Sequence, residues 1–259
     1  MAVRGIQTSI RSAALQRLGN TLQIPWREET TAEMEAIDNE LIRRHQLERL
    51  LPADAVDLVL AEGILPTAGD RRILTIMFVD IRGSAQIEET ISPEGTIEFL
   101  NTYLGLAARA IMAHHGSVNK FIGDGILAVF GVVDDPDHGA SNALAAATAI
   151  HAAFASESPS ISPGKPIRAV VALHTGPAIV GVVGLAERAD YAVLGSAVNI
   201  ASRLEGEAKD MDLATVLSGA TVAALGGSAW SLRLVTTKNL RGLSESVEIW
   251  SSDPRSPVI

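Results

Sequence analysis

Two aspartates stand beside turns in strand-like parts of the sequence, where carboxylates can hold a divalent cation. Asp80 directly follows the apolar, β-branched run 73–79, and Asp124 lies in the Gly-Asp-Gly turn that separates two further runs. If the first and third of these strands are neighbours, both carboxylates come to one edge of the sheet. Magnesium commonly takes one or two carboxylates together with phosphate oxygens. The pair therefore predicts a metal–nucleotide site, although either aspartate alone is typical of a turn.

The turn after Asp80 favours an anionic ligand. It reads Ile81-Arg82-Gly83-Ser84 and leads toward a helix, so its backbone N–H groups, those of Gly83 and Ser84 among them, can face a phosphate. The chain has no cysteine, which excludes disulfides, thiolate metal sites and a cysteine nucleophile. A metal must therefore be held by oxygen or imidazole.

A second set of polar side chains lies on a predicted helix, residues 197–205. Asn199 and Arg203 are four residues apart, so they share one face and can address one ligand together. Without further context, Asn199 would be interpreted as a helix cap and Arg203 as an ion-pair partner of Glu205 or Glu207.

The predicted elements place these residues on a ferredoxin-like scaffold. In order they are a strand at 73–79, a helix at 93–115, strands at 117–122 and 126–130, a helix at 137–154 and a strand at 167–173 that ends at His174. This β-α-β-β-α-β order is typical of an antiparallel sheet with both helices on one face. A hairpin (178–183 and 189–194), the helix at 197–205 and closing strands near 232–235 and 247–250 follow. We therefore expect an α+β fold with a C-terminal β/α extension.

Length and composition restrict the function further. The 259 residues are 47% hydrophobic and carry 21 basic against 30 acidic side chains, a net charge of −9. Such a chain can bury a sizeable core, and its negative surface disfavours general nucleic-acid binding. The sequence contains neither an apolar stretch of roughly 18 residues nor a compact signal-peptide block. We therefore expect a cytoplasmic protein.

The N-terminal part is predicted as a separate segment. Residues 1–70 show short helical patterns, and residues 71–259 form the main domain. The first 26 residues carry Arg4, Arg11 and Arg17 without an acidic residue. Residues 1–50 could therefore contact a membrane surface or a regulatory partner, although a helix that covers part of the domain is the plainer interpretation.

Four motifs resemble the successive signatures of the class III adenylate/guanylate cyclase catalytic domain. They are Phe-Val-Asp-Ile-Arg-Gly-Ser at 78–84, Asn-Lys-Phe-Ile-Gly-Asp-Gly-Ile-Leu-Ala-Val-Phe at 119–130, His-Thr-Gly at 174–176 and Tyr-Ala-Val-Leu-Gly-Ser-Ala-Val-Asn-Ile-Ala-Ser-Arg-Leu at 191–204. They occur in the family's order across about 72–250. The resemblance implies conversion of a nucleoside triphosphate into a 3′,5′-cyclic monophosphate and pyrophosphate, by attack of the ribose 3′-hydroxyl on the α-phosphorus.

The resemblance also implies a role for each polar side chain. Two Mg²⁺ or Mn²⁺ ions per site would be held by Asp80, Asp124 and the backbone carbonyl of Ile81. One ion would lower the pKa of the 3′-hydroxyl and the other would neutralise the triphosphate. Asn199 would orient the ribose, and Arg203 would stabilise charge that develops at the α-phosphate. Because the family builds its site from the aspartates of one subunit and the Lys, Asn and Arg of the other, a homodimer is implied.

Four further positions bear on the substrate. Lys120 matches the base-reading lysine of adenylate cyclases, whose cationic donor suits the N1 acceptor of adenine, so ATP is the expected substrate. The second base-reading position is Ala192, which has no acceptor for the adenine amino group. Asp190 lies two residues earlier, on the same side of a strand, and could substitute for it. Arg241 falls where the family often has a cation that contacts the triphosphate.

Other interpretations stay open. The domain could be a cyclase-like module that binds nucleotide or a partner without turnover, or a cyclase with relaxed ATP/GTP selectivity, which Ala192 would permit. A more distant alternative is another palm-like nucleotidyl transferase, such as a cyclic-dinucleotide synthase. That class shares the carboxylates but gives no role to Asn199 and Arg203, and its Gly-Gly-Asp-Glu-Phe type of signature is absent from the sequence.

Overall fold

The computed structural model describes residues 69–132, 138–156, 167–185, 188–226, 232–243 and 245–252. The predicted N-terminal segment 1–70, including the partner-binding stretch 1–50, lies almost wholly outside these residues. No helix within the described ranges is long and apolar enough to cross a membrane.

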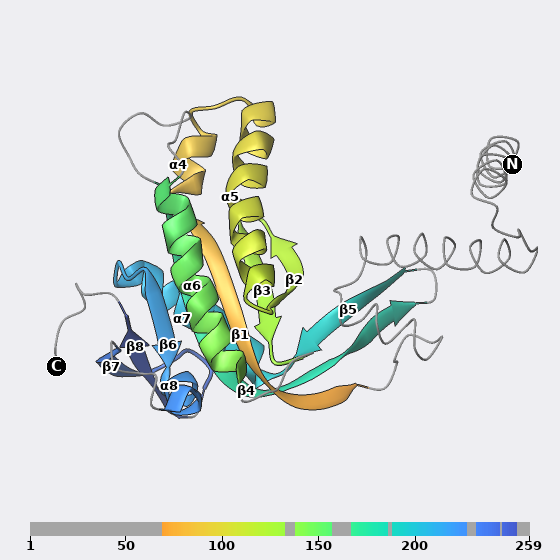
Figure 1. Ribbon diagram of the computed structural model, residues 1–259, viewed down its shortest axis with the longest axis vertical. Coiled ribbons are helices and arrows are strands. Elements are labelled where there is room, and N and C mark those ends of the chain that lie inside the picture. The colour runs from red at the N-terminus through yellow and green to blue at the C-terminus, as the bar shows by residue number, and fades with distance from the viewer. Residues whose placement is uncertain are drawn as a thin grey trace, which may run out of the picture. The chain divides into compact units, whose positions relative to one another are not determined.

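One mixed sheet organises the described residues (Figure 1). Its strands are β1 (Asp70–Arg82), β2 (Ser117–Ile122), β3 (Gly125–Phe130), β4 (Arg168–Leu185), β5 (Arg188–Leu194), β6 (Thr215–Ser218), β7 (Arg233–Asn239) and β8 (Ser246–Ser251). The helices are α4 (Ser84–Glu88), α5 (Pro93–Ala113), α6 (Gly139–Ser156), α7 (Ser196–Asp210) and α8 (Gly219–Leu225). The core strands follow the order β2-β3-β1-β4, and β1 is antiparallel to both of its neighbours. This is the ferredoxin-like arrangement that the sequence predicts.

Helices cover both faces of the sheet. Successive side chains of β1 point to opposite faces, so the strand contributes apolar side chains to a core on each face. Met77 and Val79 pack in one core with α5 and α6. Leu74 and Ile76 pack on the other face with α7. Asp80 follows the same alternation as Leu74 and Ile76, so its side chain lies on the α7 face. The strand thus presents its carboxylate to the helix that carries the predicted polar pair.

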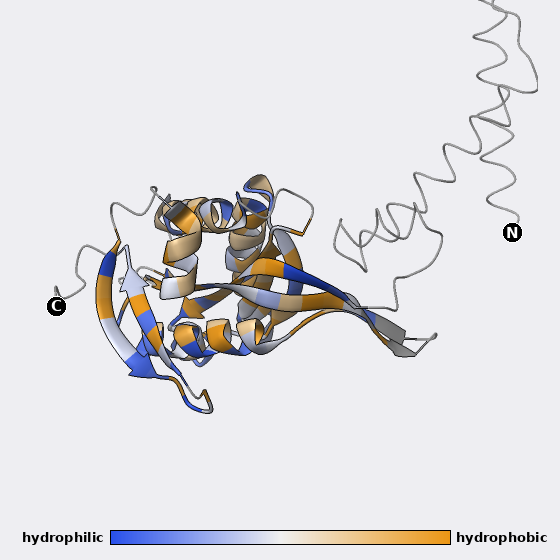
Figure 2. Cartoon of the chain, turned by 90° about the horizontal axis from the view of Figure 1, so that it is seen from below, coloured by the Kyte–Doolittle hydropathy of each residue, from blue (hydrophilic) through white to orange (hydrophobic). Residues whose placement is uncertain are grey.

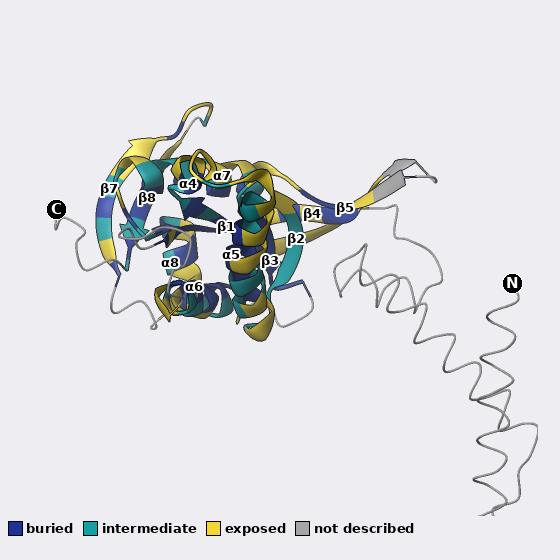
Figure 3. Cartoon of the chain, turned by 90° about the horizontal axis from the view of Figure 1, so that it is seen from above, coloured by how far each residue is buried: buried dark blue, intermediate teal, exposed yellow. Residues whose placement is uncertain are grey.

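The two helices between the core strands pack on one face, as predicted. α5 begins after Ser92, whose hydroxyl accepts a hydrogen bond from the Gly95 N–H at 3.2 Å, with Pro93 in its first turn. Its buried side chains recur at helical spacing: Phe99, Tyr103, Leu104, Ala107 and Ile111. Figure 3 shows α5 and α6 with buried sides toward the sheet and exposed sides outward.

Two core strands, β1 and β4, are longer than the sequence predicts. β4 does not end at His174 but continues to Leu185. It pairs with β1, which also starts earlier, as far as Val180, and with β5 from Ile179 onward. Asp80 therefore lies two residues before the end of its strand rather than closing it. The predicted separate hairpin is the far end of β4 paired with β5, and it projects from the body of the domain (Figure 1).

The C-terminal extension completes the sheet beyond β4. β6 pairs parallel with β4, and β8 and β7 follow it in the order β6-β8-β7. The sequence predicts β7 and β8 but neither β6 nor α8. β6 has only four residues, all of them buried, and so short an apolar run cannot be assigned to a strand from its pattern alone.

Candidate active site

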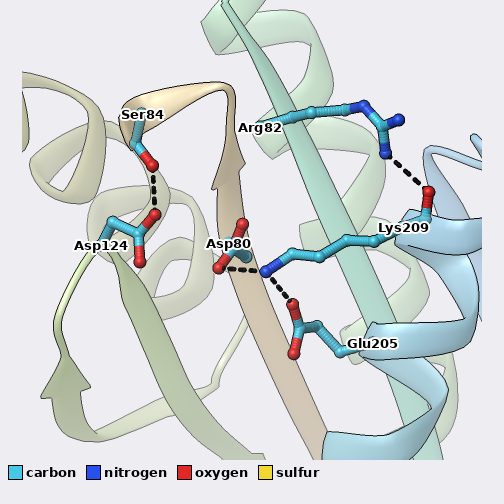
Figure 4. Close-up of polar contacts among 6 residues, drawn as sticks. All are labelled: Asp80, Arg82, Ser84, Asp124, Glu205 and Lys209. Atoms are coloured by element: carbon cyan, nitrogen blue, oxygen red, sulfur yellow. Dashed lines mark hydrogen bonds and ion pairs between the residues drawn. The ribbon is translucent and has the colours of Figure 1, made fainter. Parts of the chain in front are cut away.

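Asp80 and Asp124 lie at one end of the core sheet, as the sequence predicts. Asp80 of β1 pairs in register with Gly125, which follows Asp124 and opens β3. The turn between β2 and β3 contains Gly123, whose φ is +60°, a conformation that glycine adopts without strain. Figure 4 shows the two carboxylates on these neighbouring elements. Two oxygen donors of the kind that magnesium prefers therefore face one space.

A lysine from α7 connects Asp80 to a third carboxylate. The Asp80 side chain is 14% exposed, and the Lys209 ammonium lies 2.7 Å from its Oδ2. The same ammonium lies 2.5 Å from Oε1 of Glu205, one helical turn earlier (Figure 4). Burial raises the pKa of Asp80 to about 6, and Lys209 acts in the opposite direction. Burial lowers the pKa of Lys209, but the two carboxylates outweigh it and raise that pKa, so the ammonium stays charged.

Ser84 takes part in the site through its hydroxyl, which donates a hydrogen bond to Oδ2 of Asp124. Ser84 is buried and opens α4, and Gly83 before it has a φ of +84°. The sequence assigns Gly83 and Ser84 a role only through their backbone N–H groups. The structure adds a side-chain role for Ser84, which fixes the orientation of the Asp124 carboxylate.

The donors at this edge fit a divalent cation that also binds phosphate. Among the residues that the structure describes, no group of three or more His, Asp or Glu side chains could hold a metal by itself. Magnesium in nucleotide sites needs only one or two carboxylates, because phosphate oxygens and water complete its shell. Lys209 already places a positive charge on Asp80, which shows that this carboxylate accepts a cation. Ile81 follows in β1 with its side chain in the opposite core, and its carbonyl as a metal ligand stays a prediction.

Lys120 and Asp190 form a second cluster, where β2 meets β5. Lys120 Nζ lies 2.8 Å from Asp190 Oδ2, although the two residues are 70 positions apart in the chain. Beside them, Asn119 donates from Nδ2 to the Tyr191 carbonyl at 2.9 Å and fastens β2 to β5. Ala192 follows on β5 and is buried. Two of the three predicted base-reading residues are therefore in direct contact.

Asn199 and Arg203 form a third cluster on α7. Asn199 is exposed, whereas Nη1 of Arg203 is buried and has no hydrogen-bond partner among the described residues. The Arg203 guanidinium lies against Gly242, where an added Cβ would be 3.3 Å from Nη2. Arg241, the predicted triphosphate contact, precedes Gly242 in the same turn and is exposed. The two predicted arginines thus belong to adjacent segments.

The contacts on α7 argue against a purely structural role for this pair. The residue before the first turn of the helix is Gly195, so Asn199 is not its cap. The glutamates that could have bound Arg203 bind lysines instead, in the pairs Glu205–Lys209 at 2.5 Å and Glu207–Lys238 at 2.6 Å. Within the described ranges, neither the cap nor the glutamate pairing that the sequence allows is therefore made by Asn199 or Arg203.

Asn199 and Asp80 of one chain do not meet. Lys209, which contacts Asp80, follows Asn199 by ten positions in α7. At 1.5 Å per residue, that places Asn199 about 15 Å along the helix axis from Lys209, the residue that contacts the acidic edge. An asparagine side chain cannot span that distance, so Asn199 and Asp80 of the same chain do not contact each other directly.

Sequence reasoning missed Lys209, Glu205 and the hydroxyl of Ser84. The four-residue spacing of Glu205 and Lys209 is the signal of an ion pair on one helix face. The predicted helix ended at Glu205, whereas α7 continues to Asp210. The extra turn brings Lys209 to Asp80, a contact between distant parts of the chain that spacing alone does not reveal.

Comparison with known proteins agrees with this geometry. The family described as the adenylate and guanylate cyclase catalytic domain matches residues 68–250. An adenylate cyclase of Anabaena cylindrica is 32% identical over 215 residues, which cover 78% of this chain and 42% of the relative. Adenylate cyclase 1 of Rhizobium meliloti (strain 1021) is 36% identical over 183 residues, which cover 70% of this chain and 27% of the relative. The chain thus spans less than half the length of either relative.

A solved structure supports the same relationship. The crystal structure of the guanylyl cyclase Cya2 matches with a TM-score of 0.63 and 27% sequence identity, over 74% of this chain and 98% of that chain. The ferredoxin-like core and its C-terminal extension are therefore similar to a cyclase domain in fold as well as in sequence.

Proposed function

Because this chain belongs to the family of adenylate and guanylate cyclase catalytic domains, we propose that it converts ATP into 3′,5′-cyclic AMP and pyrophosphate. The observation that carries the proposal is the pairing of Asp80 with the Asp124 turn at one edge of the sheet. Carboxylates so placed suit a metal-bound triphosphate. The two relatives compared above are both named adenylate cyclases.

Asp80, Asp124 and the Ile81 carbonyl would hold two Mg²⁺ or Mn²⁺ ions. When bound, these ions lower the pKa of the ribose 3′-hydroxyl and offset the negative charge of the triphosphate. Asp124 is held in place by the Ser84 hydroxyl, and Asp80 by its position inside β1. The backbone N–H groups of the Gly83 turn would bind a phosphate at the same edge.

Arg203 and Asn199 would bind the reacting part of the substrate. A buried guanidinium N–H without a partner is costly unless a ligand completes it, and Arg203 Nη1 is such a group among the described residues. Arg203 would stabilise charge at the α-phosphate, and Asn199 would orient the ribose. Arg241 would contact the triphosphate from the neighbouring turn.

A homodimer would bring these groups to the aspartates of the partner molecule. Exposed apolar side chains lie along β1, β4 and β5. They are Ile73, Ile179, Val183 and Leu194, each between 43% and 55% exposed. Figure 2 shows hydrophobic stretches along these strands. Exposed apolar surface of this kind favours an interface with another protein. In a two-fold symmetric dimer, Asp80 of each chain would face α7 of the other chain, so each dimer would hold two sites.

Lys120 and Asp190 support ATP as the base-specific substrate. The ammonium can donate to N1 of adenine, and the carboxylate can accept from the adenine amino group. Asp190 would then supply the acceptor that Ala192 lacks, since both face the same side of β5. A cyclase with relaxed ATP/GTP selectivity is the second candidate, because the pair binds itself in this structure and each partner must turn toward the base.

The direct test is to incubate the purified chain with Mn²⁺ and either ATP or GTP and to separate the nucleotide products by chromatography. We expect cyclic AMP to form faster than cyclic GMP. The variant Asp124→Asn should form neither, with an unchanged circular dichroism spectrum. A folded wild-type chain that binds ATP but releases no cyclic nucleotide would support the module without turnover and overturn the proposal.

The N-terminal segment 1–70 would act as a regulatory element. The angle between two subunits decides whether their half-sites meet, so the segment that precedes the catalytic domain, which we place at 71–259, would set the activity. Removal of residues 1–60 should change the rate of cyclic AMP formation, whereas the ratio of ATP to GTP turnover should stay the same.

A further inference from the structure

Lys209 already occupies one oxygen of the carboxylate that would hold a metal. Its ammonium lies 2.7 Å from Oδ2 of Asp80, and the Asp80 side chain is only 14% exposed. A divalent cation on the same carboxylate would stand within a few ångströms of the ammonium. Like charges repel strongly at such a separation where solvent is partly excluded. Lys209 and a metal ion therefore compete for Asp80.

Glu205 offers the ammonium a second position. Its Oε1 lies 2.5 Å from Lys209 Nζ, and its side chain is 17% exposed. Glu205 and Lys209 are one turn apart on α7, the spacing at which two side chains of a helix meet without any change of backbone. The ammonium can thus leave Asp80 and keep a full ion pair.

The backbone beneath Lys209 is fixed to the strand that carries Asp80. Arg82 Nη1 donates to the Lys209 carbonyl at 3.0 Å, and Arg82 Nη2 lies 3.2 Å from Oδ1 of Asp212 (Figure 4 shows the first contact). Arg168 Nη2 lies 3.7 Å from the same oxygen. The end of α7 is therefore held by two arginines, and only the side chain of Lys209 needs to move.

We propose that Lys209 is an internal counter-ion that neutralises Asp80 while the metal is absent, withdraws to Glu205 when the metal binds, and thereby sets the metal affinity of the site. The inference rests on the proposed function, because that function assigns Asp80 to the metal. It adds a positioning residue on the helix that also carries Asn199 and Arg203. Arrival of the metal in one half-site is thus linked to α7 of the same chain.

The test is the binding of Mn²⁺ alone, without nucleotide, to the full chain by isothermal titration calorimetry. The variant Lys209→Gln should bind Mn²⁺ roughly tenfold more tightly than the wild type, since it removes a competing ion pair. Lys209→Arg keeps the competing charge and should remain within about twofold of the wild type. Lys238→Gln removes a positive charge from an α7 ion pair with Glu207 and should also remain within about twofold, which separates competition from a general change of charge.

Asp80→Asn distinguishes failure of this inference from failure of the proposed function. If Asp80→Asn binds Mn²⁺ as tightly as the wild type does, the assignment of Asp80 to the metal is overturned. Binding that depends on Asp80 but is unchanged or weaker in Lys209→Gln would overturn only the role of Lys209. A thermal unfolding measurement guards against a misfolded variant: Lys209→Gln should unfold at a lower temperature than the wild type in EDTA and gain more stability from Mn²⁺. An equal gain in both proteins would contradict the competition.

Discussion

At the scale of single residues, two carboxylates of the candidate site, Asp190 and Asp80, are paired but not saturated. Asp190 binds Lys120 through Oδ2, and Asp80 binds Lys209 through the corresponding atom. A carboxylate can accept about four hydrogen bonds through its two oxygens, so each keeps capacity for a ligand. Arg203 differs because its buried Nη1 has no described partner at all. These side chains are therefore arranged for an additional polar ligand.

The substitution Asp190→Ala tests the base-reading role of the Lys120–Asp190 pair. We expect kcat/KM for ATP to fall about tenfold, because the adenine amino group loses its acceptor, while kcat/KM for GTP changes less. Asp190 is exposed, so the free energy of unfolding should change by no more than about 0.5 kcal/mol. Steady-state kinetics with both nucleotides and a urea titration measure these effects. Equal losses for ATP and GTP would contradict base reading by Asp190.

The burial of His174 predicts how the free energy of unfolding depends on pH. It is 8% exposed, its Nδ1 lies 2.8 Å from the Ser218 hydroxyl, and burial lowers its pKa from 6.5 to about 4. The folded domain thus keeps His174 neutral where the unfolded chain protonates it. Its contribution to stability is complete above pH 6.5 and is lost as the pH falls toward 4, by up to about 3 kcal/mol.

The measurement for His174 is the free energy of unfolding between pH 8 and pH 4.5, in the wild type and in His174→Asn. The wild type should lose stability more steeply below pH 6.5 than the variant. The other histidines stay the same in both proteins, so they contribute equally. Parallel pH profiles would show that His174 titrates normally in the folded state.

At the scale of elements, the turn between β7 and β8 supports α7 from the side of Arg203. The turn is closed by a hydrogen bond from the Leu243 N–H to the Leu240 carbonyl at 3.0 Å, and Gly242 within it has a φ of +74°. A side chain at this position would strain the backbone and also touch the Arg203 guanidinium, 3.3 Å away. The turn therefore limits where that guanidinium can lie.

Gly242→Ala should separate these two effects when it is compared with Gly226→Ala. Gly226 also has a positive φ, +57°, but no described atom lies within 4 Å of an added Cβ. Both variants should lose about 1 kcal/mol of stability or more. Only Gly242→Ala should lower kcat, by roughly three- to tenfold, because it displaces Arg203 by a few tenths of an ångström. An equal effect of both variants on kcat would argue that Arg203 is not held by this turn.

The elements that the sequence predicts well are those with long, periodic patterns. The hydrophobic pattern predicts the strands around Asp80 and Asp124 and the helices α5 and α6. The order of the elements predicts that β1 and β3 are adjacent in the sheet. The prediction fails where a neighbouring strand, rather than the local sequence, decides where a strand begins or ends. β4 continues past His174 because the longer β1 lies beside it, and β6 is a strand because it joins β4 and β8. For the same reason, the sequence does not predict the contact between Asp80 and Lys209 on the last turn of α7.

At the scale of the whole molecule, the two halves of the candidate site lie on different parts of one chain. The acidic edge contacts the end of α7 through Lys209, while Asn199 and Arg203 lie toward the start of that helix. The exposed apolar residues of β1, β4 and β5 offer a surface for a second copy. A homodimer that shares its sites satisfies both observations.

The measurement that tests this arrangement most directly is the mixing of two inactive variants. Asp80→Ala removes the acidic half and Asn199→Ala removes the α7 half, so each protein alone should form almost no cyclic AMP. Random exchange of subunits makes half of the dimers mixed, each with one intact site of two. We therefore predict recovery of about a quarter of the wild-type rate per chain. A mixture that forms mixed dimers, as shown by native mass spectrometry, but stays inactive would contradict a site shared between two chains.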